Sequence, residues 1–155
     1  MPPGEYCASV ADWPDEARSG EQLFLGLLNA AREAGLSCTT GAASVAVRPV
    51  IMKPELRCAA RLHSRDMAER GFFDHVNPDE VRPEDRIRSA GYDDFGTAGE
   101  SIARGDAPAD GADPFQALAE LSTGGSECKN LVDASFDSVG IGNFGDLWTL
   151  DFAGP

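Results

Sequence analysis

The end of the chain is patterned as a β-hairpin. Apolar residues alternate with small or polar ones over Val139–Phe144 and again over Leu147–Phe152, around a turn at 143–146. A period of two is typical of strands that bury one face. Because helices are expected earlier in the chain, the hairpin excludes an all-helical fold. It favours an α+β class in which helices pack on a mainly antiparallel sheet.

Three earlier segments have the spacing and boundary residues of helices. The first is expected over Glu21–Ala34, where apolar residues recur at helical spacing and Gly35 follows as a stop. The second begins at Pro54, a residue suited to a first turn, and ends at Arg70. The third follows Pro83 and ends at Ala90. Shorter strands are expected at Val45–Val47 and Glu100–Ala103, and shorter helices at Asp113–Leu121 and Glu127–Val132.

The length of 155 residues suits one domain with its own core. Residues 1–20 hold Pro2, Pro3 and Pro14 and are expected to form an extended arm, with 21–155 as the domain.

The first eleven residues lack the features of a signal peptide, so we expect an export signal to have been removed. Nothing approaches the apolar run that a membrane span needs. We expect a monomer.

The chain carries 26 acids against 13 bases, a formal net charge of -13. This charge opposes binding to nucleic acid or to an anionic membrane surface, which carry the same sign. The simplest reason for it is solubility.

Four cysteines are spread singly, with no Cys-x-x-Cys pair: Cys7, Cys38, Cys58 and Cys128. That spacing argues against a zinc knuckle or a thioredoxin-like site. An even, scattered set favours two structural disulfides and an oxidising compartment, so the protein is expected outside the cell or in its envelope. Four cysteines allow three pairings, and spacing does not choose among them.

Four stretches of the chain form an ordered set: Cys58–His75, Asp85–Tyr92, Ala98–Ile102, and the hairpin with its approach, Phe136–Gly142 and Leu147–Phe152. In order and spacing they resemble bacterial CAP (SCP-like) domains, relatives of cysteine-rich secretory proteins, insect antigen 5 and plant pathogenesis-related-1 proteins. The likeness covers about residues 21–152.

The resemblance implies a three-layer α-β-α sandwich with a cleft where two His and two Glu can hold a divalent metal. His75 and Glu100 match the first His and a Glu of that set. Glu127 stands where the second His is expected, and the remaining acid falls near Asp137 or Ser138. His75, Glu100 and Glu127 are therefore the candidate cleft residues. His75 and Glu100 are candidate metal ligands of a weak or absent site, because zinc prefers imidazole and thiolate while carboxylates suit calcium, magnesium or manganese.

The resemblance also implies a disulfide pairing. Relatives pair a cysteine just after the first helix with one at the position of Cys128. Cys38–Cys128 and Cys7–Cys58 are therefore expected.

Other chemistry is disfavoured by the residues themselves. His63 lies on the apolar stripe of the second helix and is interpreted as a core residue, whereas Asp66, Glu69 and Arg70 are interpreted as a solvated face with local ion pairs. Every cysteine has a possible disulfide partner, which argues against a Cys–His protease, and no Gly-x-Ser-x-Gly occurs. Glu100 and Glu127 have the residue types of a glycosidase acid pair, but only their separation would decide that.

Three functions stay open. The first, which we favour, is a non-catalytic secreted module whose cleft binds a small apolar ligand or an extracellular protein partner, without a tightly bound cofactor. The second is a divalent-metal-dependent hydrolase acting on cell-wall or protein substrates. It needs a complete metal site with a bound water. The third is a structural surface domain without a ligand.

Overall fold

A computed structural model describes residues 4–35, 45–106 and 126–155. Their helices and strands are, in chain order, η1 (Ala8–Val10), α1 (Asp15–Ala34), β1 (Ile51–Met52), α2 (Pro54–Arg70), α3 (Pro83–Ser89), β2 (Thr97–Arg104), α5 (Ser126–Val132), β3 (Ser138–Phe144) and β4 (Leu147–Gly154). The expected helix at Asp113–Leu121 and Cys38 lie outside the described residues.

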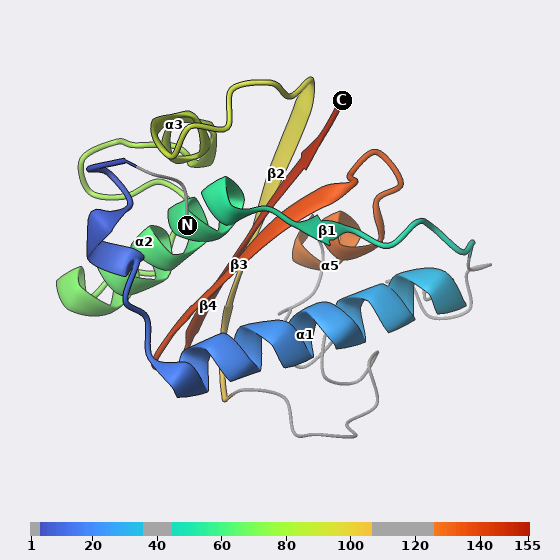
Figure 1. Cartoon of the computed structure of the whole chain (residues 1–155), viewed down its shortest axis with the longest axis horizontal. Coiled ribbons are helices and arrows are strands. Elements are labelled where there is room, and N and C mark those ends of the chain that lie inside the picture. The colour runs from blue at the N-terminus through green and yellow to red at the C-terminus, as the bar shows by residue number, and fades with distance from the viewer. Residues whose placement is uncertain (1–3, 36–44, 107–125) are drawn as a thin grey trace.

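The strands form one four-stranded sheet in the order β1-β3-β4-β2. The hairpin β3–β4 and the pair β2–β4 are antiparallel, and the two-residue β1 pairs in parallel with β3. Helices α1 and α5 lie on one face, and α2 and α3 lie on the other (Figure 1). The three-layer α-β-α sandwich with a mainly antiparallel sheet is therefore confirmed.

The period-two pattern of the hairpin sorts side chains between the two faces. Residues 148, 150 and 152 pack in the core beneath α1, with Phe24 and Leu28 of that helix. The alternate residues of β4 face α2, where Ser64 donates to Thr149 Oγ1 at 2.8 Å. The β4 side chains beneath α1 are thus apolar, whereas those beneath α2 include polar groups.

Helix α2 lies unusually close to the sheet because two residues of β3 lack side chains. A Cβ atom built on Gly140 would stand 1.9 Å from the carbonyl carbon of Leu56, and one on Gly142 would stand 2.3 Å from the amide nitrogen of Arg61. The backbone of α2 thus rests on the backbone of β3. The expected apolar stripe of α2, including His63, is buried against this face.

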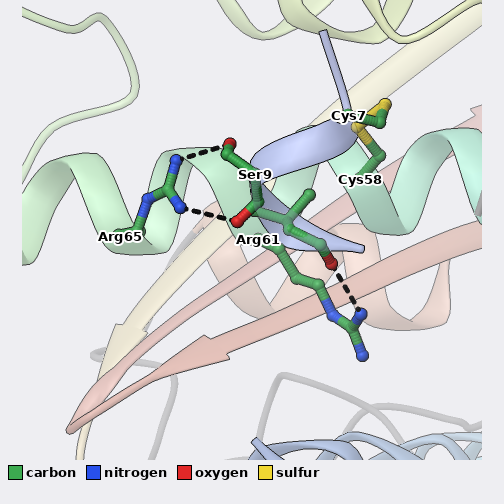
Figure 2. Close-up of a disulfide and its surroundings, with 6 residues drawn as sticks. Cys7, Ser9, Cys58, Arg61 and Arg65 are labelled. Atoms are coloured by element: carbon green, nitrogen blue, oxygen red, sulfur yellow. Dashed lines mark hydrogen bonds between the residues drawn. A yellow bond between two sulfur atoms is a disulfide. The ribbon is translucent and has the colours of Figure 1, made fainter. Parts of the chain in front are cut away.

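The N-terminal arm packs on the outer side of α2 (Figure 2). Cys7 forms a disulfide with Cys58, 51 residues further along the chain, so this half of the expected pairing is confirmed. Arg65 donates to the carbonyl and hydroxyl oxygens of Ser9 at 2.9 and 2.8 Å. Trp13, only 4% exposed, donates to the carbonyl of Asn143. The pairing Cys38–Cys128 stays a prediction.

Two boundaries differ from the sequence expectations. Helix α1 begins at Asp15, six residues before the expected Glu21, because Pro14 precedes a first turn with two acids that favour the helix N-terminus. No strand occurs over Val45–Val47; the short strand is β1 at Ile51–Met52, four residues further along. Its pairing partner is β3, which lies far along the chain, so no local pattern marks this strand.

Gly140→Ala should lower the free energy of unfolding by about 3 kcal/mol or more, because the added methyl group would overlap backbone that cannot rotate away. Gly26→Ala is the matched control. Gly26 lies on the exposed side of α1 with nothing within 4 Å of a new Cβ, so alanine should stabilise the helix by about 1 kcal/mol. Urea denaturation measures both. Equal effects of the two substitutions would contradict the close approach of α2.

Candidate functional site

Glu100 is the centre of the site. It lies in β2 directly opposite Asp151 of β4, and Asp151 lies opposite Gly140 of β3. Directly paired residues point to the same face of a sheet, so both carboxyl groups face α2. The Glu100 side chain is only 1% exposed.

His75 occupies the loop after α2. Gly71, with φ 68°, ends the helix in the left-handed conformation, and the chain then turns back toward the sheet. His75 Nδ1 lies 2.8 Å from Glu100 Oε1, while its side chain is 38% exposed. The pair therefore connects a buried carboxylate to a partly exposed imidazole.

The turn that follows His75 is held by Asn77. Its side-chain oxygen accepts hydrogen bonds from the amides of Asp79 and Val81, both at 3.0 Å, and its amide nitrogen donates to Asp66. Asp66 also pairs with Arg70 at 2.5 Å, which confirms the ion pair expected on the solvated face of α2. These contacts fix the loop that carries His75.

Arg86 of α3 holds the other oxygen of Glu100. Its Nη2 donates to Glu100 Oε2 at 2.6 Å and to the carbonyl oxygen of His75 at 2.9 Å. Its Nη1 donates to the carbonyl of Val81 at 3.0 Å. The Arg86 side chain is 4% exposed, so one buried guanidinium joins the loop, α3 and β2.

Glu100 and Asp151 behave as one buried acid pair. Burial raises the pKa of Asp151 well above its usual range, and the nearby charge of Glu100 raises it further. The pKa of Glu100 is lowered: burial opposes this, but the hydrogen bond from His75 and the charge of Arg86 outweigh it. The pair therefore holds one proton on Asp151, which donates a hydrogen bond to an ionised Glu100.

His63 lies beneath this pair. It is fully buried, which confirms the core interpretation, but it also lies 3.8 Å from Glu100 Oε1. Its Nε2 lies 2.9 Å from the carbonyl oxygen of Asp74, so that nitrogen carries the proton. Burial lowers the pKa of His63, and the ring is neutral.

The other expected site residues are placed differently. Glu127 lies in α5, but its side chain is outside the described part of the structure. Asp137 and Ser138 bond to each other at 2.8 Å at the start of β3, and neither is a partner of Glu100 among the described residues. The structure therefore brings together His75 and Glu100 and leaves the place of Glu127 a prediction.

Sequence reasoning missed three partners of Glu100. Arg86 and Asp151 were not singled out, and His63 was assigned to the core alone. A signal existed for Asp151: in a three-layer sandwich helices cover both faces of the sheet, so an acid within the hairpin requires a buried partner. In the described ranges, 4–35, 45–106 and 126–155, no three His, Cys, Asp or Glu side chains are arranged to hold a metal ion.

Comparisons with known proteins agree with the fold and the motifs. The Cysteine-rich secretory protein family (CAP) matches residues 25–143, so the chain belongs to this family. The uncharacterized protein YkwD of Bacillus subtilis (strain 168) is 27% identical over 143 residues, which is 91% of this chain and 49% of that protein. The chain thus spans about half the length of this relative.

Solved structures share the fold. An extracellular protein containing a SCP domain from Bacillus anthracis str. Ames superposes with a TM-score of 0.72 at 22% identity, covering 90% of this chain and 41% of that one. An outer surface protein from Borrelia burgdorferi has a TM-score of 0.70 at 12% identity, covering 89% of this chain and 94% of that one. No described helix is long and apolar enough to cross a membrane.

Asp151→Asn should become more stable relative to the wild type as the pH rises from about 4 to 8. An unfolded aspartate releases its proton near pH ~3.9, but folded Asp151 retains it because its pKa is raised. The contribution of Asp151 to the free energy of unfolding of the wild type therefore falls as the pH rises through that window, by up to about 1.4 kcal/mol per pH unit. Asparagine avoids the loss and can still donate to Glu100.

Urea denaturation across the pH series measures this, with Asp93→Asn, on an exposed acid before β2, as the control. The lowered pKa of Glu100 acts in the opposite direction: its contribution is lost as the pH falls. Parallel pH profiles for Asp151→Asn and the wild type would contradict a protonated Asp151.

Proposed function

We propose that this protein is an extracellular, non-catalytic CAP module that binds a ligand or protein partner at the surface around His75. The observation that carries the proposal is the use of Glu100. Both of its carboxylate oxygens are engaged by the chain itself, Oε1 by His75 and Oε2 by Arg86, and the side chain is 1% exposed. A group so enclosed serves to position His75, and a substrate cannot reach it.

Location outside the cell is supported by three observations. The disulfide Cys7–Cys58 requires an oxidising compartment or protection from reductants. The superposed structures come from an extracellular protein and an outer surface protein. The chain is strongly acidic.

The surface beside His75 favours binding through mixed apolar and polar contacts. Phe73 and Val76, on the same loop, are 41% and 40% exposed. Arg104 lies over the Phe73 ring at 4.9 Å. Exposed apolar side chains grouped around a polar centre are typical of a contact site for an apolar ligand or a protein partner.

One observation favours the alternative, a hydrolase. A surface imidazole whose Nδ1 is held by a buried carboxylate has the arrangement of a general base. That chemistry also needs a nucleophile, or a metal with a bound water, and neither is assigned among the described residues.

We expect no tight zinc binding, with a dissociation constant weaker than about 1 µM. The guanidinium of Arg86 already neutralises Glu100, and a carboxylate stands at position 127 in place of an imidazole. Isothermal titration of the purified protein with zinc measures this, with His75→Ala as the comparison. Micromolar or tighter binding that disappears in His75→Ala would contradict the expectation.

We also expect no turnover of peptidoglycan, protein or ester substrates, with or without added zinc, calcium, magnesium or manganese. Wild type, His75→Ala and Glu100→Gln should give the same background rate in these assays, with circular dichroism as the check on folding. Turnover that either substitution abolishes in a folded protein would overturn the binding module and establish the hydrolase.

A further inference from the structure

Beyond the proton that Asp151 shares with Glu100, four buried polar atoms around Glu100 have hydrogen-bonding capacity that no described residue uses. They are His63 Nδ1, Arg86 Nε and both carboxyl oxygens of Asp151. A fifth such atom, Arg57 Nε, belongs to a side chain beside Arg61 and Glu21 and is not part of this group. Each unmade buried hydrogen bond costs about 1–3 kcal/mol, so the hydrogen bonds that these atoms still lack require a partner.

The three side chains meet at one place. Nε2 of His63 lies 3.8 Å from Glu100 Oε1, Nη2 of Arg86 lies 2.6 Å from Oε2, and the Asp151 carboxyl group is hydrogen-bonded to the same carboxylate. All three are at least nine-tenths buried. They come from α2, α3 and β4 and surround the carboxylate that Glu100 extends from β2.

The chemistry of these atoms restricts what can bind between them. Nδ1 of neutral His63 only accepts a hydrogen bond, because Nε2 carries the proton. Nε of Arg86 only donates. The carboxyl group of Asp151 accepts. A guest must therefore donate to some of these atoms and accept from others.

Charge excludes the ionic guests. A metal cation would meet the guanidinium of Arg86, which cannot act as a ligand. An anion would meet the carboxyl oxygens of Glu100 and Asp151, which lie opposite each other on the sheet. A neutral molecule that both donates and accepts hydrogen bonds satisfies every group, and water is the smallest such molecule.

We propose that His63, Arg86 and Asp151 form an internal hydration site in which one or two water molecules bridge the three side chains. Buried waters of this kind make about three hydrogen bonds each, to polar groups that would otherwise lack partners. The site lies beneath the exposed His75 and goes beyond the proposed function, because it does not depend on whether His75 binds a ligand.

An atomic-resolution crystal structure of the whole chain tests this. We expect ordered water within roughly 2.7–3.2 Å of at least two of the three side chains. Cross-relaxation between bulk water and the His63 ring, measured by NMR, gives the solution counterpart. It should persist in Asp151→Asn and in the control Thr149→Val. Thr149 lies on the same face of β4 as Asp151, and its hydroxyl is already hydrogen-bonded to Ser64 of α2. It should be lost in Asp151→Leu, which fills the space with an apolar side chain.

A metal ion, an anion or a protein side chain in that density would overturn the proposal, and so would a dry space. Loss of the water signal in Thr149→Val would also overturn it, because the bridging would then depend on general packing of this face. If Asp151→Leu does not fold, the wild-type crystal structure and the Asp151→Asn and Thr149→Val variants still decide the outcome.

Discussion

The arrangement of this domain depends on the close approach of α2 to β3. Gly140 and Gly142 leave no side chain between the helix and the strand, so the backbone of α2 lies directly on the sheet. This contact brings Ser64 within hydrogen-bonding distance of Thr149 and places His63 beside Glu100. Larger residues at the two glycines would raise the helix and separate the polar groups that the site joins.

Buried charge is the second constraint, and it is paired at two separate places. Glu21 of α1 and Arg61 of α2 form an ion pair at 2.5 Å that is almost wholly buried, and Glu21 also accepts from the amide of Asn143. Around Glu100, the positive charge of Arg86 offsets one ionised carboxylate, while Asp151 stays neutral. Breaking such a pair leaves an uncompensated charge at a cost of about 3–5 kcal/mol. These pairs therefore join α1 to α2 and α3 to the sheet.

Much of the fold could be predicted from the sequence, because its elements are specified by local patterns. The period of two specified the hairpin, and Pro54 and Gly71 marked the ends of α2. The start of α1 was placed too late, because the prolines of residues 1–20 indicated an extended arm, whereas the helix begins directly after Pro14. The strand β1 was missed because its two residues pair only with distant β3.

The site was predicted in part: His75 and Glu100 were identified through the family resemblance, but their partners were not. Arg86 reaches Glu100 from a different element, and Asp151 meets it through strand register between β2 and β4. Neither contact leaves a local pattern, because it depends on how β2, β4 and α3 are assembled. Asp151 was the one exception, because an acid in a strand that helices cover on both faces needs a buried partner.

The disulfide between Cys7 and Cys58 also determines how the domain carries mechanical load. Cys58 lies within α2, the helix pressed against the middle of the sheet. Tension applied at the N-terminal end passes through the sulfur–sulfur bond straight to α2, so α1 and β1 lie in a covalent loop that bears none of it. The force therefore enters the sandwich at α2, where helix and sheet are in closest contact. Tension at the N-terminal end cannot detach α1 before α2.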